Sequence, residues 1–306
     1  MATQHVEHAY SSSASRMNAP ACCFIFIFII SALHSHLLLF EVPLALADTF
    51  QDDFDITWGF DHVTTSSDGQ ALWLMLDNSS GSSMASKKAY LFGTVSMDMK
   101  LVPGDSAGVV TAFYMASRNA EDGRDELDLE FLGNQSGEPY LLQSNVYAHG
   151  SGGREQRIRL WFDPTLDFHA YSFSWTPNHI LFMVDEVPIR VFKNLEKQGV
   201  PYLNTQAMGI YSSIWNGDEW ATQGGSIKID WAHAPFITSY QGFNVDACDV
   251  EVFECKNFSS SWSQPSLTLS QLANLEKVKK NYIVYDYCSD ISRYKIAPIE
   301  CSYNSF

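Results

Sequence analysis

Residues 124–134 read Arg-Asp-Glu-Leu-Asp-Leu-Glu-Phe-Leu-Gly-Asn, and from residue 126 to 131 acidic side chains alternate with apolar ones. Because successive side chains of a strand point to opposite faces, a strand here places Glu126, Asp128 and Glu130 in one row. Leu127, Leu129 and Phe131 then form the opposite row. The stretch therefore predicts a strand with three carboxylates on a wet face above a buried apolar backing.

The acidic row is unfavourable for a purely structural strand, because like charges on one face raise one another's pKa. Glycoside hydrolysis uses such a pair of carboxyl groups, and retaining enzymes hold them ~5–5.5 Å apart. Two glutamates four residues apart on a strand have Cα atoms ~13 Å apart, so both side chains must lean inward. Glutamate is long enough to do so, and the row indicates a glycosidase.

The composition bounds the size of the core and the class of partner. The chain has 306 residues, is 46% hydrophobic and carries a formal net charge of −16. Its length allows one large domain or two small ones around a sizeable core. No basic stripe is present to neutralise phosphates, so we expect no nucleic-acid partner.

The N-terminal region resembles a targeting segment. Residues 21–30 are apolar, and Ala45-Leu46-Ala47 has the small-x-small form of a signal-peptidase site. We interpret residues 1–47 as a secretory signal peptide, with no membrane association after its removal. The alternative is a retained signal anchor, but polar residues at 34–36 and Pro43 interrupt a span that needs ~20 mostly apolar residues.

From about residue 48 onward, short alternating runs are separated by Gly, Asn, Asp and Pro, which is typical of a sandwich or barrel. The candidate strands cover 71–76, 95–101, 108–115, 141–148, 156–162, 169–175, 180–184, 208–215 and 227–231. So many short strands predict an all-β jelly-roll sandwich of two antiparallel sheets. The sheet that carries the acidic row would be concave and form the substrate cleft.

The cysteines of the mature chain gather near its C-terminus, at Cys248, Cys255, Cys288 and Cys301. In an oxidising compartment these predict two disulfides. Three connectivities are possible, and we favour the local one, Cys248 with Cys255 and Cys288 with Cys301. A zinc site is disfavoured, because the spacing is not Cys-x-x-Cys and no histidine accompanies the set.

A short helix is expected in the same region. Ser270 is a candidate N-cap for a segment in which Leu272, Leu275 and Val278 recur at helical spacing. Residues 245–306 therefore read as a disulfide-stapled C-terminal extension with a short helix, appended to a sandwich of residues 48–244.

Several polar and aromatic side chains are suited to binding a sugar chain. The alternation of residues 143–147 puts Gln143, Asn145 and Tyr147 on one face, where amides and a phenol match sugar hydroxyls. Trp215 and Trp220 lie in a Gly-rich stretch, residues 215–225, that predicts a loop with exposed stacking rings. The polar side of residues 153–162 is expected to present Arg154, Glu155, Arg157, Arg159 and Trp161.

Residues 125–134 resemble the signature of plant xyloglucan endotransglucosylase/hydrolases in glycoside hydrolase family 16. The likeness covers nearly the whole mature chain, at residues 55–59, 90–93, 153–156, 160–165, 188–194 and 287–288. It implies that residues 48–244 are the catalytic domain and that residues 245–306 are the C-terminal extension of these enzymes. It also implies secretion to the cell wall or apoplast, a monomer, and no metal or cofactor.

The resemblance implies roles for individual residues. Glu126 is the nucleophile, Glu130 the general acid/base, and Asp128 the residue that positions them. The implied partners are a xyloglucan donor and a xyloglucan or oligosaccharide acceptor. Asn134, one of three Asn-x-Ser sequons with Asn78 and Asn257, is the family's glycosylation site. The implied substrate-binding residues are Gln143, Asn145 and Arg157 for the donor, Trp215 and Trp220 on the acceptor side, and Gly225.

Three departures from the family pattern bear on rate and acceptor preference. Arg124 stands where most members have His, Gln223 replaces an Arg, and Met84-Ala85 replaces an aromatic-Gln pair. Three alternatives to transfer stay open at this point: hydrolysis of xyloglucan, hydrolysis of mixed-linkage or 1,3-β-glucan, and sugar binding without turnover.

Overall fold

An antiparallel β-network dominates the computed structural model, which describes residues 48–118, 123–251, 255 and 266–303. These residues lie in one of the chain's two units, residues 46–306. The strands of this part are β1 (Phe54–Trp58), β2 (Val63–Thr65), β3 (Ala71–Leu76), β4 (Ser82–Lys100), β5 (Val109–Ser117), β6 (Glu126–Leu132), β7 (Leu141–Tyr147), β8 (Gln156–Arg159), β9 (His169–Trp175), β10 (His179–Val184), β11 (Val187–Lys193), β12 (Met208–Asn216), β13 (Phe236–Asp249) and β14 (Ile283–Asp286).

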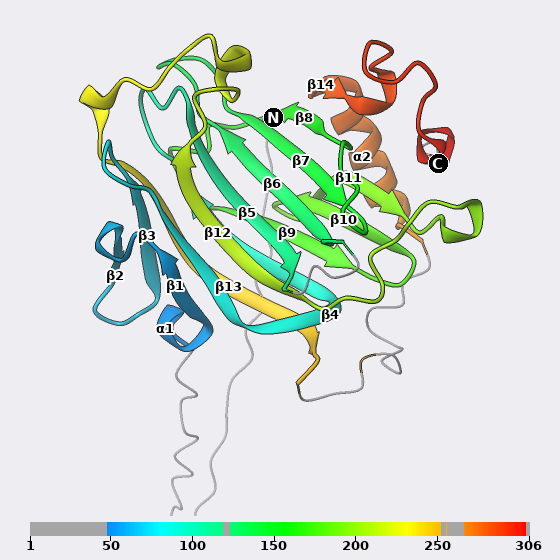
Figure 1. Cartoon of the computed structure of the whole chain (residues 1–306), viewed down its shortest axis with the longest axis horizontal. Helices are drawn as coiled ribbons and strands as arrows, with labels where there is room; N and C mark the ends of the chain where they lie inside the picture. Colours follow the sequence, from blue (N-terminus) through cyan, green and yellow to red (C-terminus); the bar gives the residue numbers. More distant parts are fainter. Residues whose placement is uncertain (1–47, 119–122, 252–254, 256–265, 304–306) are drawn as a thin grey trace, which may run out of the picture. The chain divides into compact units, whose positions relative to one another are not determined.

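The strands form two layers that share β4 (Figure 1). One layer runs β1-β4-β12-β5-β6-β7-β8-β14, and the other runs β2-β3-β13-β4-β9-β10-β11. The first half of β4 pairs with β1 and β12, and its second half pairs with β13 and β9. The strand turns between layers at Phe92 and Gly93, which have φ of 66° and 133°. The predicted all-β sandwich is confirmed, although the sequence indicated only the second half of β4.

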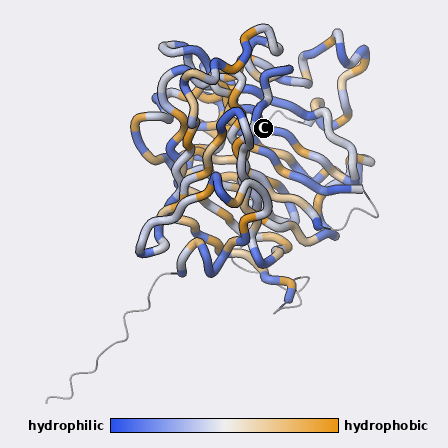
Figure 2. The backbone as a smooth tube through the Cα atoms, turned by 60° about the vertical axis from the view of Figure 1, so that its left-hand side comes forward, coloured by the Kyte–Doolittle hydropathy of each residue, from blue (hydrophilic) through white to orange (hydrophobic). Residues whose placement is uncertain are grey.

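The core lies between the layers and explains the alternation along β6. Leu127, Leu129 and Phe131 are all 0% exposed, and the Phe131 ring packs 4.6 Å from Tyr171 of the opposite layer, centroid to centroid. Each such burial contributes ~1.5–3 kcal/mol. The backbone trace in Figure 2 accordingly changes repeatedly between apolar and polar residues along the strands.

The predicted strand at 227–231 is wrong. Residues Trp231–His233 form the 3₁₀ helix η4 instead, because the Asp230 carboxylate accepts a hydrogen bond from the Ala232 backbone N–H at 3.0 Å and caps a turn. The other helices are α1 (Phe50–Asp53), α2 (Leu269–Asn281) and the 3₁₀ helices η1 (Phe60–His62), η2 (Glu196–Gln198), η3 (Thr222–Gly225), η6 (Tyr287–Ser289) and η7 (Ile299–Tyr303). Among the described residues, no helix combines the length and apolarity that a bilayer crossing requires.

The predicted C-terminal helix is confirmed as α2, but its N-cap is Thr268 rather than Ser270. The Thr268 hydroxyl accepts from the Gln271 N–H, and the Gln271 side chain accepts in return from the Thr268 N–H, which forms a capping box. Leu275 is buried against Val191 of β11 and its neighbours. The helix thereby covers the outer face of the β10-β11 pair.

The C-terminal region joins the sandwich through strands as well as through α2. The expected boundary at residues 244–245 lies within β13, which carries Cys248. Farther on, β14 pairs with β8 and becomes the edge strand of the layer that contains β6. The two disulfides are Cys248–Cys255 and Cys288–Cys301, the local pairings favoured from the sequence.

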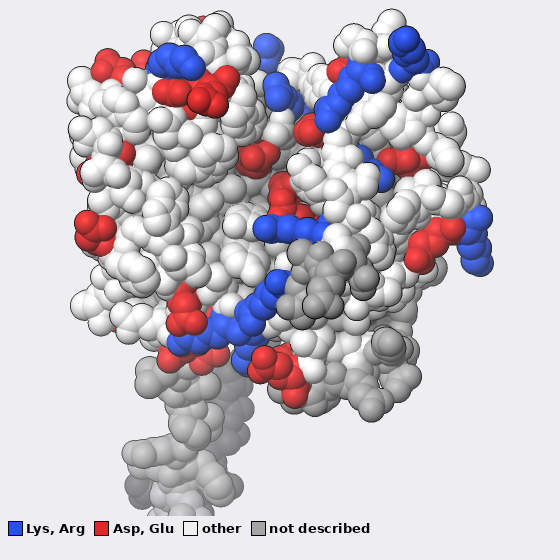
Figure 3. Space-filling model, in the orientation of Figure 1, with Lys and Arg blue, Asp and Glu red and all other residues white. Residues whose placement is uncertain are grey.

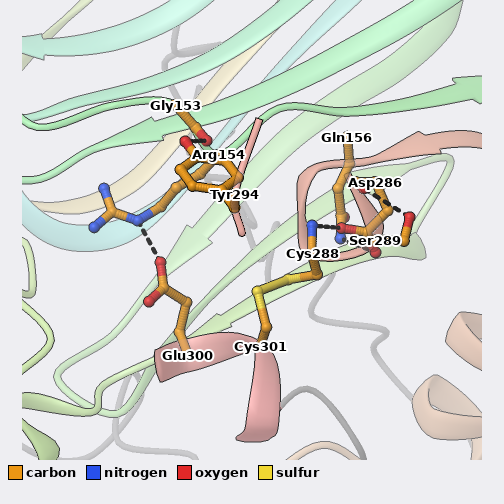
Figure 4. The surroundings of a disulfide bond; sticks show 9 residues. All are labelled: Gly153, Arg154, Gln156, Asp286, Cys288, Ser289, Tyr294, Glu300 and Cys301. Carbon is orange, nitrogen blue, oxygen red and sulfur yellow. Dashed lines mark hydrogen bonds and ion pairs between the residues drawn. A yellow bond between two sulfur atoms is a disulfide. The ribbon is translucent and has the colours of Figure 1, made fainter. Parts of the chain in front are cut away.

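A buried polar cluster surrounds the second disulfide (Figure 4). The Arg154 Nε donates to the Glu300 carboxylate at 2.7 Å, and both side chains are more than nine-tenths buried. The Tyr294 hydroxyl donates to the Gly153 carbonyl at 2.8 Å. These contacts fasten residues 286–301 to the segment that leads into β8.

Candidate active site

The acidic row lies on the central strand of the concave layer. β6 is flanked by β5 and β7, and its register places Asp128 opposite Asn145 and Glu130 opposite Gln143. The acidic side chains face a cleft, while the residues between them fill the core. The sequence prediction of a strand with one acidic and one apolar face is confirmed.

The cleft has a volume of about 980 Å³. Figure 3 shows carboxylates gathered within the hollow over the central strands of this face. The cleft brings together most of the residues predicted to bind substrate, namely Gln143, Asn145, Arg157, Trp215 and Trp220 with the three acids. Gly225 is not among its lining residues. A β carbon there would lie 2.0 Å from the Glu219 carbonyl oxygen, so this glycine serves a tight turn.

Glu130 ends a chain of hydrogen bonds across three strands. The Arg157 Nε donates to the Gln143 Oε1 at 2.7 Å, and the Gln143 Nε2 donates to the Glu130 Oε2 at 2.6 Å. Burial raises the pKa of Glu130 above its ordinary value, the negative charge of Glu126 adds to the rise, and the Gln143 hydrogen bond opposes it. Glu130 therefore keeps its proton to higher pH than an exposed glutamate.

Asp128 is the most deeply buried member of the row. Burial raises its pKa well above the ordinary value, and the charges of Glu126 and Glu130 raise it further. A hydrogen bond with Glu126 contributes in the same direction, because it favours the protonated form of Asp128. A protonated Asp128 can donate to Glu126 and fix the orientation of that carboxylate.

Glu126 has a different environment from Glu130. Its carboxylate forms an ion pair with the Arg124 guanidinium. Arg124 lies over the ring of Tyr114, 5.9 Å from its centroid, and Tyr114 stacks on Tyr211. The departure at position 124 therefore puts a permanent cation in contact with Glu126.

One prediction about the side chains near β7 and β8 is wrong. Arg154 is not on the polar face with Arg157. It precedes β8, which begins at Gln156, and its side chain is buried against Glu300. Asn145 does line the cleft, but its Oδ1 accepts from the Val146 and Arg154 N–H groups. Only its amide NH₂ is left for a ligand.

Trp215 and Trp220 lie together on the other side of the acids. Trp215 belongs to β12, which confirms the predicted strand at 208–215, and Trp220 lies in the turn that follows. Their ring centroids are 6.1 Å apart. Both rings are half-buried against Val110, Leu132 and Ala221, so they present fixed apolar surfaces to the cleft.

Comparison with known proteins identifies the family. Residues 50–233 match glycosyl hydrolases family 16, and residues 257–301 match the xyloglucan endo-transglycosylase C-terminus. The chain belongs to the xyloglucan endotransglucosylase/hydrolases of glycosyl hydrolase family 16.

Curated relatives span most of the chain. Xyloglucan endotransglucosylase protein 6 of Diospyros kaki is 51% identical over 269 residues, covering 83% of this chain and 89% of that protein. Probable xyloglucan endotransglucosylase/hydrolase protein 7 of Arabidopsis thaliana is also 51% identical, over 86% of this chain and 92% of that protein. The solved β-glucanase of Bacillus licheniformis shares the fold, with a TM-score of 0.52 and 21% identity over 65% of this chain and 94% of the glucanase.

The C-terminal extension supplies cleft residues that the sequence reasoning missed. Tyr285 of β14 and Arg293 line the cleft. The Arg157 guanidinium lies 5.6 Å from the Tyr285 ring centroid, and Arg293 forms a 2.6 Å ion pair with Glu155. The pairing of β14 with β8 places Tyr285 and Arg293 at the cleft. Neither alternation nor spacing signals a contact between segments more than 120 residues apart in sequence.

The remaining predicted positions lie away from the acids. Met84 is fully buried and Gln223 adopts a φ of 49° within η3. Asn134 is the second residue after the end of β6, and its Nδ2 donates to the Pro139 carbonyl at 3.1 Å. Asn78 is exposed, and Asn257 lies outside the described residues. Within the described residues, no group of three or more His, Cys, Asp or Glu is arranged to hold a metal ion.

Proposed function

We propose that this protein cleaves the β-1,4-glucan backbone of xyloglucan with retention of configuration and transfers the cleaved chain to a xyloglucan acceptor. The observation that supports this most is the split of the acidic row. Glu126 pairs with a cation, whereas burial raises the pKa of Glu130. Two carboxyl groups with opposed environments are what retaining glycoside chemistry requires.

In the first step, Glu126 attacks the anomeric carbon and Glu130 donates its proton to the departing glycosidic oxygen. The C–O bond to the leaving chain breaks as the bond to Glu126 forms. Asp128 holds Glu126 through its hydrogen bond, and Gln143 and Arg157 hold Glu130 in line. The product is a glycosyl-enzyme with Glu130 ionised.

In the second step, Glu130 removes a proton from the acceptor hydroxyl, whose oxygen attacks the anomeric carbon and releases Glu126. We assign Gln143, Asn145 and Arg157 to the donor chain and Trp215 and Trp220 to the acceptor side. The two sets lie on opposite sides of the acids, on β7-β8 and at β12. The name of the Diospyros kaki relative and the matched xyloglucan endo-transglycosylase C-terminus support transfer over hydrolysis.

The direct test incubates the protein with xyloglucan and a labelled xyloglucan oligosaccharide. Incorporation of label into polymer is the expected result. A rise in reducing ends without incorporation would establish hydrolysis instead, and faster turnover of mixed-linkage barley glucan would assign the protein to that substrate. Glu126→Ala is the control, because it removes the proposed nucleophile and is expected to abolish both readouts.

We further propose that the protein acts outside the cell as a monomer, after removal of residues 1–47. The two disulfides support an oxidising compartment. N-terminal sequencing of protein from the culture medium of plant cells should begin at or near Asp48. Recovery of the intact N-terminus in a membrane fraction would contradict the proposal.

A further inference from the structure

Trp58 is an exposed aromatic side chain outside the cleft lining described above. It is the last residue of β1, and 44% of its surface is exposed. A single exposed ring carries no meaning by itself. The position of Trp58 in the sheet is informative, because β1 is the edge strand of the concave layer on the side away from β14.

One line of directly opposed residues joins Glu130 to Trp58. Glu130 lies opposite Ala112 of β5, Ala112 opposite Ser213 of β12, Ser213 opposite Ser83 of β4, and Ser83 opposite Trp58. Directly opposed residues place their side chains on the same face of a sheet. The register of β1 shifts between Ile56 and Trp58, and this shift leaves Trp58 opposite Ser83. Strands are ~4.8 Å apart, so Trp58 stands ~19 Å from Glu130 along this line.

The line between them is a trough of small side chains. Ala112 and Ser213 form part of the cleft lining, and Ser83 follows them without a bulky group. The Ser83 hydroxyl is 2.6 Å from the Thr57 hydroxyl, so two polar groups lie close together at the Trp58 end of the trough.

The indole of Trp58 is seated over Gly81. A β carbon at Gly81 would lie 2.9 Å from the Trp58 Cη2, so the absence of a side chain there makes room for the ring. The ring therefore lies at the start of β4, close to Ser83 and the end of the trough. The floor that starts at the acids continues to an aromatic surface.

We propose that Trp58 is the stacking platform of an additional glucan-binding subsite at the β1 end of the cleft. A β-1,4-glucan is extended and presents apolar ring faces, which suits a trough of small side chains that ends in an indole. The Thr57 and Ser83 hydroxyls would bond its hydroxyl groups. The proposal rests on the proposed function, because it concerns the same glucan chain.

The test measures binding by calorimetry in the full-length chain carrying Glu126→Ala, with xyloglucan oligosaccharides of one, two and three repeat units. Adding Trp58→Ala should weaken binding of the longest oligosaccharide about tenfold, or ~1.4 kcal/mol. Binding of the shortest should not change, which also shows that the fold is intact. Trp58→Phe should retain most of the affinity, because it keeps a ring.

Phe60→Ala is the matched control. Phe60 is 74% exposed and only two residues away, but it lies in η1 outside the line of opposed residues, so its removal should leave all affinities unchanged. If the unaltered protein transfers label but Trp58→Ala does not change the affinity for any oligosaccharide, the subsite is overturned and the proposed function stands. If the unaltered protein transfers no label, the proposed function is overturned and the subsite with it.

Discussion

Replacing Glu300 by Gln is expected to destabilise the protein through the charge that it leaves behind. Arg154 and Glu300 form a 2.7 Å ion pair with side chains only 9% and 7% exposed. The substitution keeps the shape and a neutral hydrogen bond but leaves the Arg154 guanidinium buried without a counter-charge. Desolvation of that cation is then uncompensated.

The magnitude follows from the partners that Arg154 retains. Breaking a buried ion pair costs ~3–5 kcal/mol, but Arg154 still donates to the backbone carbonyls of Val146 and Ser151. We therefore expect a loss of about 2–4 kcal/mol of unfolding free energy. At ~2–4 °C per kcal/mol for a domain of this size, a loss of ~3 kcal/mol lowers the melting temperature by about 6–12 °C.

The assay is urea unfolding followed by tryptophan fluorescence under oxidising conditions. Two further variants isolate the cause. The double replacement Arg154→Met with Glu300→Leu removes both charges and should recover stability to within ~1 kcal/mol of the unaltered protein. Glu276→Gln breaks an exposed pair with Lys279 on α2 and should cost less than ~0.5 kcal/mol. If the double variant is as unstable as Glu300→Gln, the reasoning from an uncompensated charge is refuted.

Three predictions concern the acids. Glu130→Gln removes the proposed proton donor and should lower kcat/KM on xyloglucan by ~10²–10⁴; full activity would exclude Glu130 as the acid. Because the Gln143 hydrogen bond favours the ionised form, Gln143→Met should raise the pKa of Glu130 further. Activity is lost as pH rises through that pKa, so the alkaline limb of the kcat/KM profile should move to higher pH, and a downward move would contradict this. Arg124→Gln removes the cation beside Glu126 and should lower kcat/KM roughly tenfold, with Arg124→Lys partly restoring it; equal loss in both variants would show that charge is not what matters.

Patterns within a short stretch of sequence predicted the features that depend on that stretch alone. The alternation of acidic and apolar residues fixed β6 and its two faces, since the period of a strand is set by its own backbone. The same reasoning failed at 227–231, where a side-chain cap overrides an alternating pattern. It also placed the N-cap at Ser270 and did not consider Thr268, although only Thr268 has Gln three positions later.

The residues that come from distant segments could not be predicted in this way. Tyr285 and Arg293 reach the cleft only because β14 pairs with β8, and a pairing register across such a separation has no signature in one sequence. The burial of Arg154 was hidden for the same reason, since its partner Glu300 lies near the end of the chain.

The pairing of β14 with β8 has a consequence for biosynthesis. Until residues 283–286 have been synthesised and folded, β8 is the outer strand of its layer and exposes unpaired backbone N–H and C=O groups. A nascent chain that already contains all three acids therefore has an unpaired sheet edge, to which strands of other chains can pair. Residues 283–286 cover this edge, so premature termination before β14 should yield aggregates rather than a smaller enzyme.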